Sequence, residues 1–264
     1  MVKSMSNRDL EVWVEEADDL IEIHEYEKSN ALLDKYIKEA LKDTKNNPPF
    51  LCFRDFIEYY AYFRKDLLTT KADVFWSPRV LDRAYLMKAY INNENGEFKE
   101  ALININNAYS YNPFNTNTLF EKAETHKLMG DYDKMLNTIK YAYDFIYNAY
   151  DLRRYYMYYG LYYQILGKVK VAYALYKLAL FYDKEDELSK NEIDFLEKKY
   201  KRVKWPTSTK EIKKIITKEN IKIGIKEENK RFLYELSLIK EIRENKELFN
   251  YLNSIRKDIN KQVV

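Results

Sequence analysis

The chain has 264 residues, of which only five are glycine and five are proline, well below the roughly 7% glycine and 5% proline of an average protein. β-Sandwiches and barrels need turn residues at short intervals, and doubly wound nucleotide-binding domains need a glycine cluster, so these fold classes are excluded. The net charge of +3 is too small to indicate a partner. One cysteine and two histidines exclude an intramolecular disulfide, a multi-cysteine metal site and a histidine cage. Long helices around an apolar core are therefore expected.

The N-terminal segment and the distribution of apolar residues indicate where the protein is located. Acidic residues interrupt the first twenty positions, so no signal peptide is expected. No window approaches 18 uncharged apolar residues, so we expect no membrane span and a cytoplasmic protein. The 26 tyrosines occur with abundant lysine, asparagine and isoleucine. This composition is typical of an AT-rich genome, such as that of a bacterium or phage.

The first residues along the chain predict an irregular helix hairpin. Ala17 and Leu20 lie on one helical face, and His24 is expected at the turn. Pro48 and Pro49 are expected to end this hairpin, because proline cannot continue a helix interior.

The segment that follows the hairpin is unusually apolar. Residues 51–65 predict a helix that is covered by its neighbours, and Cys52 within it is expected to be a buried, inert thiol. Residues 72–78 are expected to form a loop that Phe75 and Trp76 anchor by burial.

Three glycines then occur in similar contexts, each between two helix-like stretches. Gly96, Gly130 and Gly167 are separated by 34 and 37 residues, a period typical of stacked helix hairpins. Small and large residues repeat around them: Tyr85, Ala89, Phe98, Ala101, Ile105, Ala108 and Pro113; then Leu119, Ala123, Tyr132, Ile139 and Ala142; then Tyr156, Gly160, Tyr163, Val169, Ala172, Tyr176 and Ala179. The pattern resembles the tetratricopeptide repeat. The resemblance implies an all-α, right-handed superhelical solenoid of antiparallel helix hairpins, in which Gly160 permits close helix packing.

We expect three regions in the chain. Residues 1–80 would form a helical region with the irregular hairpin, residues 81–204 the repeats with a capping helix over 188–204, and residues 205–264 a basic helical subdomain. Within the last region, helices are expected over 209–218, 227–245 and 246–260. Gly224 has no assigned role.

The resemblance also implies a binding face, because the first helices of such repeats line a concave groove. The candidate groove residues are Arg83, Leu86, Tyr90, Glu121, Glu124, Arg154 and Tyr158. Arginine and tyrosine are enriched at protein interfaces. The expected function is therefore a non-catalytic scaffold or adaptor that binds a protein partner, as a peptide or helix, in this groove.

Catalytic patterns are missing from the sequence. No nucleophile with a base, phosphate-binding loop or metal-ligand cluster is recognisable, and adjacent acidic pairs such as Glu15-Glu16 diverge on a helix. We therefore expect no enzyme activity, no metal site and no cofactor.

An uneven charge distribution leaves two alternatives open. Residues 1–30 carry nine acidic and three basic side chains, whereas residues 198–264 carry nineteen basic and nine acidic ones. The basic end is compatible with a regulator that binds nucleic acid, with Trp205 as one contact, or with a peptide-sensing regulator. The opposite charges of the two ends are also compatible with a head-to-tail homo-oligomer.

Overall fold

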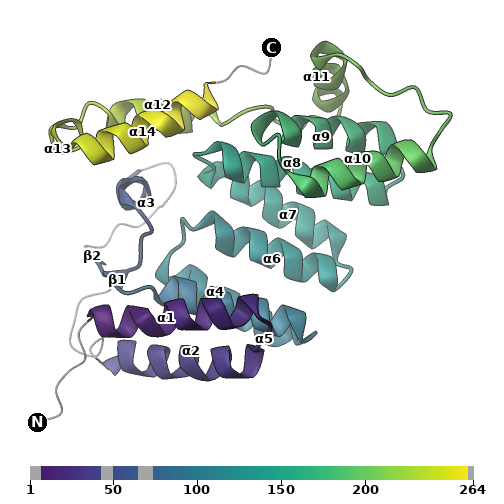
Figure 1. Cartoon of the computed structure of the whole chain (residues 1–264). Coiled ribbons are helices and arrows are strands. Elements are labelled where there is room, and N and C mark those ends of the chain that lie inside the picture. The colour runs from purple at the N-terminus through teal and green to yellow at the C-terminus, as the bar shows by residue number, and fades with distance from the viewer. Residues whose placement is uncertain (1–6, 43–49, 65–73, 261–264) are drawn as a thin grey trace, which may run out of the picture. The chain divides into compact units, whose positions relative to one another are not determined.

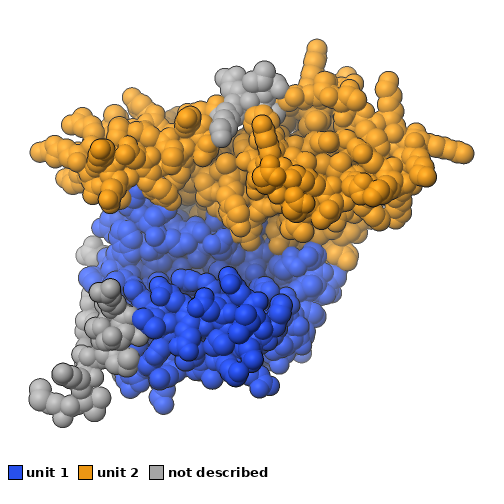
Figure 2. Space-filling view, in the orientation of Figure 1, with its two compact units in different colours: residues 1–131 blue, residues 132–264 orange. Residues whose placement is uncertain are grey.

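The computed structural model describes residues 7–42, 50–64 and 74–260 (Figure 1). These residues belong to two compact units, residues 1–131 and 132–264 (Figure 2). The predicted end of the first hairpin at Pro48 and Pro49 lies outside the described residues. The predicted division at residues 80 and 204 stays a prediction.

The first unit is built from helices and one very short parallel strand pair. Its helices are α1 (Asn7–Glu22), α2 (Tyr26–Ala40), α3 (Phe56–Tyr62), α4 (Leu81–Glu94), α5 (Phe98–Tyr111) and α6 (Thr116–Leu128), and its strands are β1 (Phe50–Leu51) and β2 (Phe75–Trp76). Helix α1 packs on α2, and α4 packs on α5. Helix α4 also contacts α2 and α6, so consecutive hairpins share their interfaces.

The first hairpin has the small residues that close helix packing requires. Ala17 on α1 and Ser29 on α2 are fully buried, and the Ser29 hydroxyl donates to the Ala17 carbonyl oxygen at 2.8 Å. Leu33 and Ala40 complete this side of the core and are also fully buried. The predicted irregular hairpin is therefore confirmed, and its second helix begins at Tyr26, two residues after His24.

The hairpin turns share one hydrogen-bond arrangement. At Gly96, with φ of 75°, the Gly96 N–H donates to the Asn93 carbonyl and the Glu97 N–H donates to the Asn92 carbonyl. This Schellman arrangement needs a left-handed residue, a conformation in which glycine has no Cβ penalty. Gly130 and Gly167 repeat it, with φ of 78° and 72°. His24 adopts the same conformation with φ of 60°, so the first turn has the repeat geometry without the glycine.

The segment between the first two hairpins differs from the prediction. The expected helix over 51–65 is wrong for its first part, because Leu51 lies in β1 and Cys52 lies in the irregular connection that follows. Helix α3 begins only after Asp55, whose Oδ1 accepts a hydrogen bond from the Glu58 N–H at 3.0 Å. An N-cap of this kind fixes a helix start.

The neighbouring aromatic pair forms β2 rather than a loop. Phe75 is 58% exposed and Trp76 is 37% exposed, so the prediction that both rings are buried is wrong. Trp76 does anchor the segment. Its indole N–H donates to the Phe53 carbonyl at 3.0 Å, and its ring stacks on Tyr59.

The second unit is helical in all its regular elements, as far as it is described. These are α7 (Tyr132–Ala142), the 3-10 helix η2 (Tyr143–Phe145), α8 (Ala149–Ile165), α9 (Val169–Tyr182), α10 (Glu187–Lys199), α11 (Thr209–Lys218), α12 (Glu227–Leu236), α13 (Lys240–Glu244) and α14 (Lys246–Ile259). Helix α8 packs on α9, which also contacts α10 and α11. Among the helices described in either unit, none combines the length and apolar character needed to cross a bilayer.

Gly160 confirms the predicted close approach of two helices. A Cβ atom placed at Gly160 on α8 would lie 2.5 Å from Cε1 of Tyr176 on α9, far inside van der Waals contact. Tyr176 is fully buried, and its hydroxyl donates to Gln164 Oε1 at 3.0 Å. Glycine therefore makes room for a large ring that joins the two helices.

The last helices follow the sequence prediction in part. Helix α11 has the predicted bounds, and α14 ends one residue earlier than predicted. The capping helix α10 is shorter than expected, because it ends at Lys199. The expected helix over 227–245 is interrupted at residues 237–239 and forms α12 and α13.

Gly224, which had no predicted role, attaches the last helices to the rest of the second unit. Its N–H donates to the Tyr156 hydroxyl at 2.7 Å, and its carbonyl accepts from the Tyr143 hydroxyl at 3.0 Å. Asn229 on α12 adds two hydrogen bonds, to the Asp144 and Ile146 carbonyls. The φ of 81° at Gly224 explains why glycine occupies this position.

Candidate functional site

Three predicted groove residues lie on one side of α4. Arg83, Leu86 and Tyr90 are separated by three and four residues, the spacing that places side chains on one helix face. Arg83 is exposed, Leu86 is half-buried and Tyr90 is 36% exposed. We call these three residues the α4 stripe. Arg83 is already engaged, because its Nη2 lies 2.5 Å from Asp18 Oδ2 on α1.

Tyr90 lies among other polar and aromatic groups. Its ring meets that of Tyr26 edge-on, with 6.5 Å between the centroids. Desolvation, together with the nearby Glu94 carboxylate and Tyr26, raises the pKa of the Tyr90 hydroxyl to about 12. Tyr90 is therefore neutral at physiological pH and can both donate and accept a hydrogen bond.

Helix α6 brings the next two predicted residues to the same unit. Glu121 accepts a hydrogen bond from Asn93 Nδ2 at 2.7 Å, which links α6 to α4 beside the α4 stripe. Asn93 Nδ2 also donates to Thr125 at 2.9 Å, while its buried Oδ1 has no hydrogen-bond partner among the described residues. Glu124 forms an ion pair with Lys127 on its own helix at 2.5 Å.

The remaining two predicted residues belong to the second unit. Arg154 on α8 is half-buried, and its guanidinium lies 5.7 Å from the Tyr150 ring centroid. Tyr158 is only 5% exposed, so little of its ring reaches the surface. The structure thus brings together Arg83, Leu86, Tyr90, Glu121 and Glu124 on α4 and α6 of the first unit. The groove role of all seven residues stays a prediction.

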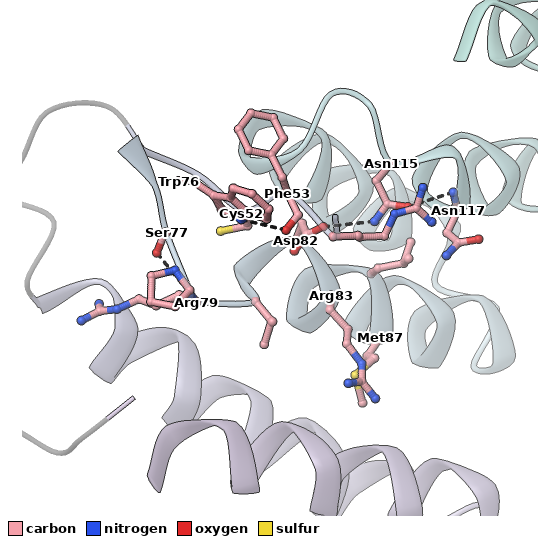
Figure 3. Close-up of a pocket in the computed structure, with 14 residues that line it drawn as sticks. Cys52, Phe53, Trp76, Ser77, Arg79, Asp82, Arg83, Met87, Asn115 and Asn117 are labelled. Carbon is pink, nitrogen blue, oxygen red and sulfur yellow. Dashed lines mark hydrogen bonds between the residues drawn. The ribbon is translucent and has the colours of Figure 1, made fainter. Parts of the chain in front are cut away.

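A cavity of about 500 Å³ adjoins the α4 stripe (Figure 3). Arg83 and Leu86 contribute to its wall, so the cavity and the stripe are continuous. The other lining residues come from three short segments of the chain: Cys52, Phe53 and Arg54; Trp76, Ser77, Pro78, Arg79, Val80, Asp82 and Met87; and Asn115 and Asn117. The wall therefore combines apolar surface with three guanidinium groups and one carboxyl group.

A buried polar network lies behind this cavity. Asn112 Nδ2 lies 2.9 Å from the Cys52 carbonyl oxygen, 2.8 Å from Glu58 Oε2 and 3.1 Å from Asp82 Oδ2. Asn115 Nδ2 is also 3.1 Å from Asp82 Oδ2. These contacts join the start of α3, the start of α4 and the connection between α5 and α6. Buried polar groups need such partners, so the network fixes the geometry of the cavity wall.

Both carboxyl groups of the network have raised pKa values. Glu58 and Asp82 are each 3% exposed, and burial is the largest cause, because it disfavours the charged form. Arg54 opposes this effect at Glu58, where its Nε lies 2.5 Å from Oε1. The hydrogen bonds from Asn112 and Asn115 oppose it at Asp82.

Cys52 is the buried, unreactive thiol that was predicted. It is 2% exposed, and desolvation, followed by the Asp82 charge, raises its thiol pKa to about 12. The N–H groups of Leu81 and Asp82 at the start of α4 lower it by less. The thiolate needed for nucleophilic attack is therefore scarce at neutral pH.

Sequence reasoning missed the residues that shape the cavity. Asn112 and Asn115 flank Pro113, a motif interpreted only as a repeat boundary, and Asn115 is the N-cap of α6. Glu58 has no predicted role, because the apolar run 51–65 predicts a continuous helix. The charged residues Arg54, Asp55 and Glu58 within this run are the available signal that part of the segment is not a simple core helix.

Among the residues that the structure describes, no group of three or more histidine, cysteine, aspartate or glutamate side chains is arranged to hold a metal ion.

Comparison with known proteins rests on structure. No protein-family model matches the sequence, and no curated protein matches it. The solved structure of pilF from Pseudomonas aeruginosa, a tetratricopeptide-repeat lipoprotein, has a TM-score of 0.52 and 11% sequence identity. The match covers 97% of this chain and 94% of that chain. At this identity the similarity defines the fold alone. The cytoplasmic location of this chain stays a prediction.

A second solved structure is more distant. It comes from Bacteroides ovatus ATCC 8483 and has a provisional description as a protein binding protein. Its TM-score is 0.32 and its sequence identity is 15%, and the match covers 95% of this chain and 99% of that chain. The fold assignment rests on the first comparison, on the paired helices and on the repeated glycine turns. The chain is an all-α helical repeat protein with the tetratricopeptide fold.

Proposed function

We propose that the chain is a non-catalytic protein-interaction scaffold that binds a peptide or partner helix on the α4–α6 face of its first unit. The observation that carries this proposal is the continuity between the α4 stripe and the adjoining cavity. Arg83, Leu86 and Tyr90 supply a linear contact surface over two helical turns. The cavity, at about 500 Å³, falls within the size range of ligand pockets.

The chemistry of the surface fits a peptide better than a small polar substrate. Phe53, Trp76 and Met87 give the cavity an apolar lining for one anchoring side chain. Arg83 and Glu121 add opposite charges on α4 and α6, which would favour one orientation of the bound chain. Such an arrangement of a desolvated anchor with polar groups around it is common at interaction hot spots.

A selection experiment with a random-peptide library on the full-length chain tests this proposal. Enriched peptides should then be titrated against the native chain and against the double variant R83A/Y90A. We expect the variant to bind at least about tenfold more weakly, corresponding to about 1.4 kcal/mol. The matched control is K99A/I103A, which removes one lysine and one exposed aliphatic side chain from α5.

The control variant should bind like the native chain, and circular dichroism should show that both variants are folded. Peptides that bind R83A/Y90A as tightly as the native chain would place the interaction elsewhere and refute the proposal. Equal losses in both double variants would indicate a nonspecific effect and would count against it as well.

A further inference from the structure

Helix α1 carries an exposed acidic stripe on the side that does not contact its neighbours. Glu15, Glu16, Asp19 and Glu22 are all exposed and fall within about a third of the helix circumference, at 100° per residue. None of these four carboxylates forms an ion pair with a described residue, whereas Asp18, outside the stripe, pairs with Arg83. We call these four residues the acidic stripe.

Two apolar side chains extend this surface. Val12 is 52% exposed and Ile23 is 66% exposed, and both lie on the same face of α1 as the acidic stripe. These two apolar side chains remain in contact with solvent, and no described residue neutralises the carboxylates around them. Like charges this close also repel one another, so a cationic partner would be stabilised here.

Helix α11 in the second unit carries the opposite pattern. Lys210, Lys213, Lys214 and Lys218 lie along one side of the helix, and none of them forms an ion pair with a described residue. We call these four residues the basic stripe. Over residues 201–222 eight basic side chains face only two acidic ones, Glu211 and Glu219. Glu219 is already paired with Lys168.

We propose that the acidic stripe of one chain binds the basic stripe of a second copy, so that chains associate head to tail. The two stripes are opposite in charge and similar in length. Each places four like charges along about two turns of helix, at residues 15–22 and 210–218. Two helices with such faces can form several ion pairs at once, as charged flanking positions do in coiled coils.

This interface is heterologous, because different surfaces of the two copies meet. Each contact between two copies leaves one acidic and one basic stripe free, so assembly continues until a ring closes or a filament forms. The interface uses neither Arg83 nor Tyr90. The proposal therefore stands independently of the peptide-binding function.

A nucleic acid is the main competing partner for the basic stripe, and the structure favours it less. Trp205, the expected base-stacking residue, already stacks on Tyr173, with 4.6 Å between the ring centroids. A nucleic acid would also leave the acidic stripe of α1 unexplained. Association between copies accounts for both surfaces.

The first test measures molar mass by light scattering at several protein concentrations and salt concentrations. The Debye length falls from about 30 Å at about 0.01 M salt to about 3 Å at about 1 M. At low salt we expect an average mass above the 32.0 kDa of one chain that rises with concentration. At high salt it should return to one chain. A native protein that stays at one chain under all conditions overturns the proposal.

The second test uses neutral variants. One chain carries E15Q/E16Q/D19N/E22Q, and another carries K210Q/K213Q/K214Q/K218Q. Each variant alone should remain at one chain at low salt, because one half of the interface is missing. A mixture of both should form a heterodimer of about twice 32.0 kDa and no larger species, since only one pair of intact stripes remains.

The control variant E235Q/E241Q/E247Q removes three exposed carboxylates from α12, α13 and α14 and should assemble like the native chain. Failure of the two neutral variants to form the heterodimer, or self-association of either one alone, contradicts head-to-tail binding. Low-salt binding of a fluorescent single-stranded RNA through the four lysines, without any rise in protein mass, would identify nucleic acid as the partner instead.

Discussion

Replacing Gly160 by alanine tests the closest contact between α8 and α9. The new Cβ would lie 2.5 Å from Cε1 and 2.8 Å from Cδ1 of Tyr176. Because the Tyr176 ring is fully buried, it cannot swing into solvent. Overpacking of this kind costs about 1–3 kcal/mol, while alanine gains up to about 1 kcal/mol in helix propensity over glycine. Because a contact of 2.5 Å places the cost in the upper part of this range, the net expectation is a loss of about 1–2 kcal/mol in the free energy of unfolding.

A double variant separates the clash from other effects. In the repeat formed by α4 and α5, Ala89 and Ile105 occupy the positions of Gly160 and Tyr176 and are almost fully buried. G160A/Y176I therefore recreates a pair that the chain already uses. The double variant should be more stable than the sum of the two single losses predicts, because residues in contact are not additive.

Urea unfolding monitored by circular dichroism and by tryptophan fluorescence measures these free energies. Of the three tryptophans, Trp205 stacks on Tyr173 and reports on α9 in the second unit, whereas Trp13 and Trp76 report on the first unit. If G160A is as stable as the native chain, the two helices can separate slightly at no cost, and the reasoning fails. Strict additivity in the double variant would refute it equally, because the two side chains would then not be in direct conflict.

Three further predictions concern the first unit. H24G should stabilise the chain by about 1 kcal/mol and raise Tm by about 2–4 °C, because it removes the steric cost of a Cβ atom in the left-handed conformation at φ of 60°. An unchanged or lower Tm in calorimetry contradicts this. Burial raises the pKa of Asp82 above 3.8, so its stabilising contribution is lost as pH rises through the raised value. D82N should therefore gain stability relative to the native chain as pH rises above 3.8, and a difference in urea midpoints that does not change with pH would refute this. Cys52 should react with a thiol reagent only after denaturant is added, and rapid labelling of the folded chain would show that the thiol is accessible.

The repeat architecture could be predicted because its signals are local. A glycine at a left-handed turn, and a small residue that packs against a large one, can each be recognised from the residue types at a few nearby positions. Gly96, Gly130 and Gly167 all adopt the required conformation. His24 shows the limit of this reasoning, because a residue other than glycine adopts the same left-handed conformation at the first turn.

The cavity could not be predicted, because its wall is made by distant parts of the chain. Asn112 contacts Glu58 and Asp82, which are 54 and 30 residues away in the sequence. Composition could not show that residues 51–65 would start with a strand and a capped short helix. The pairing of Leu51 with Trp76 depends on a partner that lies 25 residues later.

The attachment of Gly224 affects how the chain can be divided. The buried Tyr156 hydroxyl and the half-buried Tyr143 hydroxyl both bond to this one residue. A fragment ending at residue 204 would leave both hydroxyls without these partners, at a cost of about 1–3 kcal/mol for each one that stays buried. It would also expose the surface of α8 that α14 contacts. The C-terminal helices therefore form part of the folding unit to which α8 and α9 belong. A chain that lacks residues 205–264 would have a less stable core around these two helices.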